Sequence, residues 1–278
     1  MSELVINMDC FKAIKNQPDN SVDLIITSPP YADIVSYGKD ISVKKTDDYV
    51  DWLLPLFKDI VRVLKPSGSF ILNINDKCDN GCRSTFIYDL ISRNNKETDL
   101  KLYDTYIWHK KNGIPNGGKK RFRNMTEFIF HFCKDPKEMK FHMDRVLEEP
   151  NISTLPERTR GKKKRCMYDS NKQERINYYE EEIKDRSNEK IRPDNIVRFS
   201  TAASMRDNDI KHPAPFHKDL PLYYINLLTD EGDLVIDPFS GIGTTGIACK
   251  ELNREYIGYE LNKTYADFSK KRIEKWNS

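Results

Sequence analysis

The stretch "LVIDPFSGIGTTGIACKELNREYIGYEL", residues 234–261, contains one complete unit of strand, loop, helix and strand. An apolar run ends at Asp237, a turn with two glycines follows, and helical spacing begins near Thr244. A second apolar run then ends at Glu260. Because strands that are joined through a helix lie parallel and need helices to cover them, this stretch predicts an α/β fold.

The turn inside this stretch has the properties of a cofactor-binding loop. Gly241 and Gly243 carry no side chain that would keep the backbone away from a ligand. Glu260 follows Gly241 by 19 residues, a spacing that suits hydrogen bonds to ribose hydroxyls at the end of the second strand. The alternative is an ordinary tight turn with a surface glutamate.

The run GIGTTG, which ends at Gly246, also satisfies the GxGxxG pattern of dinucleotide-binding enzymes. A nicotinamide oxidoreductase is therefore a rival interpretation. The Asp-Pro-Phe-Ser that precedes the run is unusual in hydride-transfer enzymes, and this interpretation leaves a second motif near the N-terminus without a role.

The same alternation of strands and helices occurs on both sides of one charged segment. Periodicity weakens near residue 135 and returns near residue 206, so we predict the divisions 1–134, 135–205 and 206–278. Outside the middle segment, the pattern predicts a Rossmann-like, mostly parallel sheet with helices on both faces. The expected strands are 3–10, 21–27, 69–74, 103–110 and 126–132, and the expected helices are 49–64, which KPSG (65–68) would end, 88–93 and 220–229.

Positive charge is concentrated in the middle of the chain. The whole chain carries 46 Lys and Arg and 43 Asp and Glu, but residues 110–206 alone hold 24 and 15, a net of +9. Two clusters, 110–123 and 158–165, each contain six basic residues and no acidic one. Such clusters favour a polyanion such as nucleic acid, and the alternative for each is a solvated loop.

The remaining composition excludes several classes of protein. No apolar run approaches the roughly 20 residues that span a bilayer, and the N-terminus lacks a basic segment followed by an apolar one. The six cysteines are scattered, which indicates reduced thiols and a cytoplasmic location without a membrane partner. Cys78 and Cys82 lack the further ligands of a metal site, so we expect no metal.

A second motif, "TSPPY" at residues 27–31, follows the apolar strand 21–27 directly. Ligands of open parallel sheets bind beyond the carboxyl ends of strands, and this motif lies at such an end. The two prolines lack N–H groups and hold Ser28 and Pro29 extended, which leaves a stiff rim of oxygen acceptors beside the ring of Tyr31. The alternative is a proline-rich turn with a packing tyrosine.

This rim fits the exocyclic amino group of a heteroaromatic base. The lone pair of such a nitrogen is delocalised into the ring, so the nitrogen is a poor nucleophile. Acceptors aimed at its protons help to localise the lone pair and stabilise the charge that develops during attack. Holding the nitrogen beside an electrophile adds a proximity effect of about 7–11 kcal/mol at best.

At these residues the chain resembles the amino-group DNA methyltransferases that use S-adenosylmethionine. "TSPPY" is similar to their catalytic motif and "DPFSGIGTT" (237–245) to their cofactor motif. The catalytic motif comes first and the cofactor motif last, an order similar to that of the permuted beta subgroup. "NMDCF" (7–11) and "KHPAPF" (211–216) also match in place, and the resemblance covers nearly the whole chain except about 135–205.

The resemblance implies the permuted methyltransferase order of this fold, with S-adenosylmethionine as cofactor. Residues 1–134 would form the catalytic half, 135–205 a basic target-recognition insertion and 206–278 the cofactor-binding half. The catalytic pocket would consist of Ser28, Pro29, Pro30 and Tyr31. The cofactor would be held by Asp9, Cys10, His212, Pro213, Ala214, Asp237, Phe239, Ser240, Gly241, Gly243, Thr244 and Glu260.

Serine at position 28 indicates the target base. Family members with serine here resemble N4-cytosine methyltransferases, whereas aspartate usually accompanies N6-adenine. The chain is therefore expected to be a site-specific enzyme that methylates N4 of cytosine in double-stranded DNA within a restriction-modification system. N6-adenine methylation, RNA or protein methylation, and a catalytically silent DNA-binding protein of the same fold are the alternatives.

The target base lies inside a duplex, so it must be flipped out to reach this pocket. Basic side chains would hold the DNA, mostly through its phosphates. The residues expected to contact DNA are Lys119, Lys120, Arg121, Arg123, Arg158, Arg160 and Arg165. A cognate restriction endonuclease is left open as a partner, as is the choice between a monomer and a homodimer.

Overall fold

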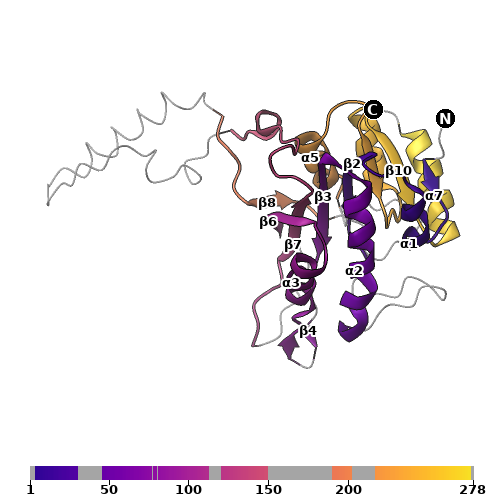
Figure 1. Cartoon of the computed structure of the whole chain (residues 1–278). Coiled ribbons are helices and arrows are strands. Elements are labelled where there is room, and N and C mark those ends of the chain that lie inside the picture. Colours follow the sequence, from indigo (N-terminus) through magenta and orange to yellow (C-terminus); the bar gives the residue numbers. More distant parts are fainter. Residues whose placement is uncertain are drawn as a thin grey trace, which may run out of the picture. The chain divides into compact units, whose positions relative to one another are not determined.

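The computed structural model describes residues 4–30, 46–76, 78–79, 81–112, 120–149, 190–201 and 217–276. The chain divides into two compact units, and Figure 1 shows the sheet and the helices of the larger one. The larger unit consists of residues 1–142 and 195–278, and the smaller unit of residues 143–194. Among the described helices, none is long and apolar enough to cross a membrane.

The larger unit is built on an eight-stranded sheet with the order β1-β10-β9-β2-β3-β7-β6-β8. Among its described strands, β7 alone is antiparallel to its neighbours, so the predicted mostly parallel sheet is confirmed. The strands are β1 (Val5–Ile6), β2 (Val22–Thr27), β3 (Leu64–Ile74), β6 (Lys101–Lys110), β7 (Thr126–Cys133), β8 (Ile196–Phe199), β9 (Leu234–Asp237) and β10 (Glu255–Tyr259). A separate hairpin pairs β4 (Cys78–Asp79) with β5 (Cys82–Arg83).

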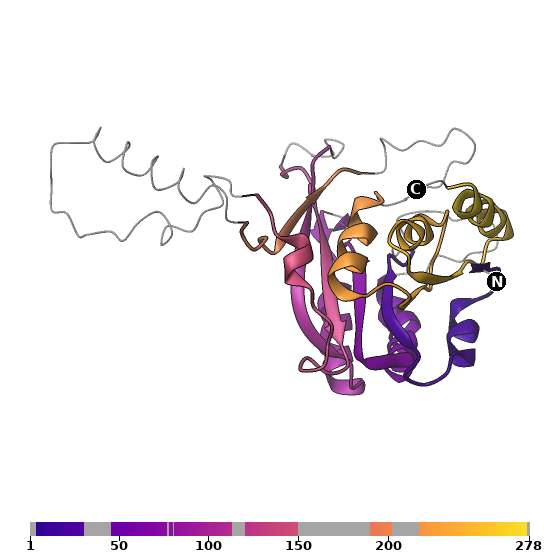
Figure 2. The ribbon, with the colours of Figure 1, turned by 90° about the horizontal axis from the view of Figure 1, so that it is seen from above.

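Helices cover both faces of this sheet, as predicted. Figure 2 shows the purple helices α2 and α3 on one side and the orange and yellow helices α5, α6 and α7 on the other. The bounds are α1 (Cys10–Ala13), the 3-10 turn η1 (Ile14–Asn16), α2 (Thr46–Val63), α3 (Phe86–Glu97), α5 (Asp219–Leu228), α6 (Thr244–Glu251) and α7 (Lys263–Lys275).

Burial explains the sequence pattern of these elements. Strand β2 is buried at every position, because it lies between β9 and β3 with helices above and below. The apolar stripe of α2 packs into the same core. Ring centroids of Phe57, Phe70 and Phe132 lie 5.3, 5.6 and 5.5 Å apart pairwise, which joins α2, β3 and β7.

The predicted boundary between the helix 49–64 and the strand 69–74 was wrong. The KPSG segment (65–68) does not separate helix from strand, because β3 begins at Leu64, directly after α2. Leu64 pairs with Val22 and Ser69 pairs with Leu24, so the residues between them form an irregularity inside the strand. Gly68 fits there because a Cβ atom would lie 3.0 Å from the Val22 carbonyl oxygen.

The elements α7 and β8 were not predicted, nor were the β4–β5 hairpin and the 3-10 turn η2 (Met143–Val146). Helix α7 buries only Ala266, Ser269 and Ile273, so its apolar stripe is weak. Its start did carry a signal, since the side chain of Asn262 accepts hydrogen bonds from the backbone N–H of Thr264 at 2.9 Å and of Tyr265 at 3.3 Å. Strand β8 has only four residues, and it is recognised as a strand by its parallel pairing with β6 in the folded structure.

In the smaller unit, residues 143–149 and 190–194 are described. They contain the 3-10 turn η2 (Met143–Val146) and one antiparallel bridge between Glu148 and Ile191. The predicted divisions at 135 and 205, and the recognition role of the segment between them, stay predictions.

The cysteines in the described part of the chain are free thiols. Cys10, Cys133 and Cys249 are buried, whereas Cys78 and Cys82 are exposed on the β4–β5 hairpin. Within the described ranges no three His, Cys, Asp or Glu side chains are grouped in a way that could hold a metal ion.

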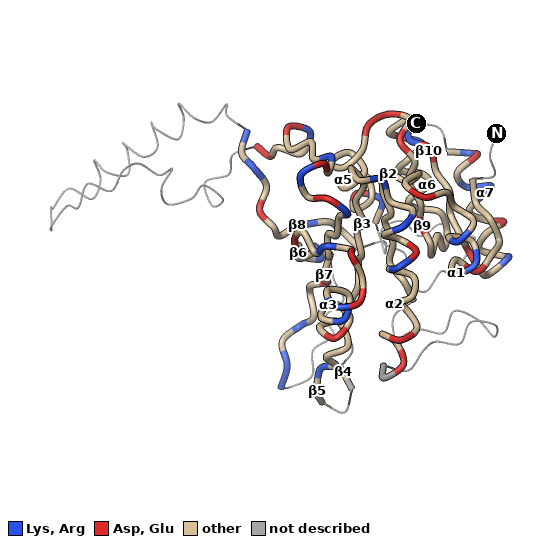
Figure 3. Tube along the Cα trace, viewed as in Figure 1, with Lys and Arg blue, Asp and Glu red and all other residues tan. Residues whose placement is uncertain are grey.

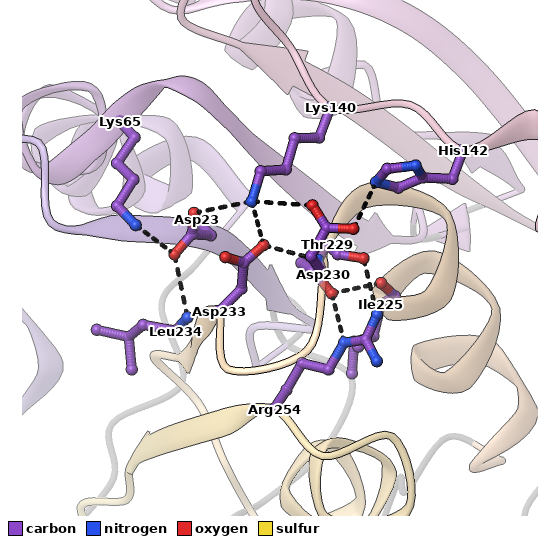
Figure 4. A network of polar contacts seen from close by, with 10 residues as sticks. All are labelled: Asp23, Lys65, Lys140, His142, Ile225, Thr229, Asp230, Asp233, Leu234 and Arg254. Atoms are coloured by element: carbon purple, nitrogen blue, oxygen red, sulfur yellow. Dashed lines mark hydrogen bonds and ion pairs between the residues drawn. The ribbon is translucent and has the colours of Figure 1, made fainter.

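A charged network closes the amino ends of the central strands. Both signs of charge gather there (upper part of Figure 3), and Figure 4 shows the contacts. Asp23, nearly fully buried, accepts from Lys65 Nζ at 2.7 Å and from the backbone N–H of Leu234 at 3.1 Å, and it lies 3.6 Å from Lys140 Nζ. Lys140 Nζ also donates to Asp233 at 2.5 Å. The network thereby ties the segment after β7 to β2 and β9.

We expect Asp23→Ala to lower the free energy of unfolding by about 2–4 kcal/mol, since it leaves two partly buried ammonium groups without their shared carboxylate. Urea unfolding at pH 7 measures this. Asp51→Ala is the control, because the Asp51 side chain is 72% exposed beside Arg93 and its loss should matter far less. Equal effects of the two variants would contradict the structural role of the network.

Candidate active site

The two predicted motifs meet at the carboxyl edge of the sheet. Strands β10, β9, β2 and β3 are neighbours and run parallel, so all four end at this edge. Ser28, Pro29 and Pro30 follow β2, while the glycine turn 238–243 follows β9. Two segments from opposite ends of the chain are thus brought side by side, which the sequence alone could only suggest.

A buried carboxylate joins the motifs directly. Asp237, at the end of β9, accepts from the hydroxyl of Thr27 at 2.6 Å and from that of Thr245 at 2.6 Å on its other oxygen. The backbone N–H of Phe239 donates to it at 3.1 Å. Burial raises the pKa of Asp237 to about 6, and the hydroxyls and the amide oppose this rise by stabilising the charged form.

The proline corner is held from below by helix α2. The hydroxyl of Tyr49 donates to the Pro30 carbonyl oxygen at 3.0 Å. Tyr49 is buried, and its ring centroid lies 4.9 Å from Phe86 and 5.4 Å from Trp52. The predicted rim of free acceptors therefore needs correction at Pro30, because one lone pair of that oxygen already binds Tyr49.

An aromatic side chain of α2 also reaches the cofactor motif. The ring centroid of Trp52 lies 5.8 Å from Phe239 and 5.4 Å from Phe11. Tyr49 and Trp52 lie one helical turn apart, so one face of α2 supports both the corner and the glycine turn. This face positions the two motifs relative to each other.

The glycine turn requires its glycines for conformation and for space. Gly241 and Gly243 have φ of 53° and 79°, values that favour glycine. A Cβ atom on Gly243 would lie 2.1 Å from the Ser269 hydroxyl of α7. Ser240 shares a hydrogen bond of 2.8 Å with the hydroxyl of Tyr256, so its side chain fixes the turn from inside.

Glu260 lies beside this turn at the end of β10, as predicted. Its two carboxylate oxygens accept from the backbone N–H of Gly241 at 2.9 Å and of Asn262 at 2.8 Å. Each oxygen keeps a second lone pair that could accept a ribose hydroxyl. Burial raises the pKa of Glu260 to about 7, against the effect of these amides.

Asp9 and Cys10 follow β1, which pairs with β10, the strand that ends just before Glu260. The side chain of Asp9 caps α1 by accepting from the backbone N–H of Phe11 at 2.8 Å. Cys10 is buried, and burial, followed by the charge of Asp9, raises the pKa of its thiol well above the ordinary value. Asn7 fixes this neighbourhood by donating to the carbonyl oxygens of Glu260 and Leu261 at 2.9 Å each.

The last predicted cofactor residue in the described part of the turn is Thr244. It begins α6, is buried, and lies 3.5 Å from the guanidinium of Arg272. The same guanidinium donates to the Ile242 carbonyl oxygen at 3.0 Å. Helix α7 therefore braces the turn from the outside.

Several predicted residues lie outside the described residues. These are Tyr31, His212, Pro213, Ala214, Lys119, Arg158, Arg160 and Arg165. Their roles stay predictions.

The described basic residues lie at the same edge of the sheet as the proline corner. Strand β7 runs antiparallel to β3, so the residues that precede Thr126 lie beyond the carboxyl end of β3. Lys120, Arg121 and Arg123 are exposed there. Lys110, in contrast, forms an ion pair of 2.5 Å with the buried carboxylate of Glu127, so its ammonium group has a partner within the folded chain.

Sequence reasoning missed the residues that support the motifs: Thr27, Tyr49, Trp52 and Thr245. The two threonines stand inside the quoted motifs, but nothing local indicates that their hydroxyls share one carboxylate. The two aromatic residues follow the apolar period of α2, which predicts burial and not a supporting role.

Comparisons with known proteins agree with this geometry. Residues 22–271 match the family model described as DNA methylase, of the N6/N4 type. The type II methyltransferase M.HpaI of Haemophilus parainfluenzae is 30% identical over 284 residues, covering 99% of this chain and 75% of that protein. The DNA adenine methyltransferase YhdJ of Escherichia coli is 26% identical over 278 residues, covering 98% and 83%.

Two solved structures share the fold. The PvuII DNA methyltransferase, described as cytosine-N4-specific, superposes with a TM-score of 0.71 at 24% identity, covering 99% of this chain and 86% of that one. A DNA modification methylase of Thermus thermophilus, complexed with S-adenosyl-L-methionine, has a TM-score of 0.62 at 23% identity, covering 98% and 93%. These likenesses confirm the predicted fold class.

We expect Thr27→Val to cost about 1–3 kcal/mol of stability, because it removes a hydrogen bond from a buried carboxylate. The corner should also shift, so methyl transfer should fall more than the affinity for S-adenosylmethionine. Unfolding curves, cofactor titration and transfer rates measure the three quantities. Thr105→Val, in β6, is the control and should leave stability, cofactor affinity and transfer rate unchanged. A Thr27→Val enzyme that behaves like this control would contradict the role of the hydrogen bond between Thr27 and Asp237.

We expect cofactor affinity to weaken as the pH falls below about 7, by at most tenfold per pH unit, because ribose hydroxyls donate best to the ionised carboxylate of Glu260. Glu260→Gln should lower the affinity at pH 8 and flatten the profile between pH 6 and 8. Titrations of S-adenosylmethionine across this range test both effects. Glu255→Gln, at the exposed start of the same strand, should keep the wild-type profile.

Proposed function

The chain belongs to the N6/N4 DNA methylase family, and we propose that it transfers the methyl group of S-adenosylmethionine to N4 of cytosine in double-stranded DNA. We further propose that it acts on one specific sequence, in the cytoplasm, as the modification enzyme of a restriction-modification system. The type II methyltransferases among its relatives support that last step.

One observation carries this proposal: the hydrogen bond of 2.6 Å between Thr27 and Asp237. It joins the residue before the proline corner to the first residue of the cofactor motif, across 210 positions of sequence. A base amine at the corner and a methyl donor at the glycine turn would therefore face each other over a short distance, which methyl transfer requires.

The described residues fit the cofactor. Glu260 offers carboxylate lone pairs to a ribose, the glycine turn allows close approach of the backbone, and Asp9 and Cys10 follow β1, the neighbour of β10 in the sheet. S-adenosylmethionine supplies a methyl group on a positively charged sulfur, which makes that carbon electrophilic. A neighbourhood with the carboxylates of Asp237 and Glu260 suits this positive charge.

The corner would act on the base in three ways. Ser28 donates to N3 of cytosine, a main-chain carbonyl oxygen accepts an N4 proton, and the ring of Tyr31 stacks on the base. The N4 lone pair then forms the new N–C bond while the C–S bond breaks, and its electrons remain on sulfur. The nitrogen carries the positive charge until it loses one proton, by way of the acceptor, to solvent.

Adenine N6 is the second candidate target. The likeness to YhdJ, an adenine methyltransferase, favours it. The neutral serine at position 28, which can donate as well as accept, favours cytosine. Nucleoside analysis decides between them.

The test uses DNA from a host without methyltransferases, labelled S-adenosylmethionine and the full chain. Enzymatic digestion and chromatography identify the labelled nucleoside. Labelled N4-methylcytosine is the expected result. Labelled N6-methyladenine would correct the base, and an absence of label in DNA would overturn the proposal.

We expect Ser28→Ala to lower the rate of methyl transfer by about 10²–10³-fold, the effect of losing one donor aimed at a reacting group. The affinity for S-adenosylmethionine should stay close to wild type. Ser21→Ala, just before the other end of the same strand, is the matched control, because its hydroxyl donates only to the Pro18 carbonyl oxygen at 2.7 Å. A Ser28 variant with the wild-type rate would exclude serine from the pocket.

A further inference from the structure

One side chain of the basic edge is neither charged nor buried. Phe122 is 96% exposed, far more than any other large hydrophobic residue of the described part of the chain, of which Tyr88 is next at 58%. An aromatic ring in water forgoes the stabilisation that burial would supply. The position therefore needs a reason other than packing within the folded chain.

The neighbours of Phe122 indicate what kind of partner the ring could meet. Lys120, Arg121 and Arg123 surround it in sequence, and all three are exposed. A protein partner with an apolar pocket would have to bury these cations as well, at a considerable cost. A nucleic acid offers both requirements at once, since phosphates pair with the cations and bases stack on the ring.

Phe122 is also held in place relative to the sheet. The guanidinium of Arg121 donates to the Gly81 carbonyl oxygen at 2.7 Å, in the turn of the β4–β5 hairpin. Arg83, on β5, pairs with Asp76, which is buried just after the end of β3. The lower part of Figure 3 shows basic residues along this segment beside β5. The ring thus extends from an anchored segment.

The topology places this segment at the same edge of the sheet as the proline corner. Thr27 pairs with Leu72 and Leu72 with Phe130, so β7 begins four residues beyond the level of Thr27, and Phe122 precedes that start by four more residues. Strand β7 is two positions from β2 in the sheet, a lateral distance of about 10 Å. A duplex that delivers a base to the corner would pass over this edge of the sheet, from which the segment with Phe122 extends.

We propose that Phe122 enters the duplex and stacks in the space left by the flipped target base. This inference rests on the proposed function. Flipping a base breaks its stacking and pairing, and an inserted apolar side chain can replace the lost stacking. The ring would lower the cost of extrusion without touching the methyl group or the reacting nitrogen, so Phe122 is a positioning residue.

The experiment compares two duplexes that carry the sequence methylated by the wild-type enzyme. In one the target base is paired, and in the other it lies opposite an abasic site, where flipping costs less. We expect Phe122→Ala to lower kcat/KM by about 10- to 100-fold on the paired duplex, the range seen when one base–aromatic stack is removed. On the abasic duplex the loss should shrink to about threefold or less.

Two variants serve as controls. Phe122→Trp should keep most of the activity on the paired duplex, since the larger ring can still stack. Tyr103→Ala removes another exposed aromatic ring, 44% exposed near the start of β6 at the opposite edge of the sheet, and should behave as wild type on both duplexes. The melting temperature of Phe122→Ala should not change, because the ring is 96% exposed.

A Phe122→Ala enzyme with wild-type rates on the paired duplex would overturn the inference and leave the proposed function intact. An equal loss on both duplexes would also overturn it, because the ring would then act in general DNA binding. A wild-type enzyme that transfers no label to any DNA, so that no such sequence exists, would overturn the proposed function and this inference with it.

Discussion

The site depends on one buried carboxylate. Asp237 ends β9 in the centre of the sheet, where an isolated charge would be costly. The hydroxyls of Thr27 and Thr245 and the amide of Phe239 satisfy it, and they come from β2, α6 and the turn between β9 and α6. The same three hydrogen bonds therefore stabilise the charge and set the relative positions of the two motifs. A structural requirement of the fold thus also brings the parts of the site together.

The order of strands explains why a site can be assembled from the two ends of the chain. The early strand β2 lies between the late strand β9 and β3, which follows β2 in the sequence. Strand β8 pairs in parallel with β6 at the edge of the sheet, so neither β2 nor β9 borders it.

Charged side chains have different roles at the amino and carboxyl ends of the strands. At the amino edge, Asp23, Lys140 and Asp233 neutralise one another and close the structure. At the carboxyl edge, Lys120 and Arg123 are exposed around an unburied phenylalanine. A nearly balanced net charge of +3 conceals this division.

Local pattern in the sequence determined the α/β class, most of the elements, the family and the two motifs. The apolar run before Asp237, the glycines after it and the corner after Thr27 are short-range features, and the fold kept them where they were predicted. Errors occurred where local signals were ambiguous. The KPSG segment looked like a break yet lies within β3, and α7 has too narrow an apolar stripe to be recognised.

Only the tertiary structure decided which residues support the motifs. Tyr49 and Pro30 are 19 residues apart, Thr27 and Asp237 are 210 apart, and no periodicity links such pairs. The tertiary structure also shows that Lys110 is paired with Glu127 whereas Lys120 and Arg123 are exposed, although all three belong to one basic cluster of the sequence. The physical reason is that hydrogen-bond partners and burial depend on which strands become neighbours, and that order is a property of the whole sheet.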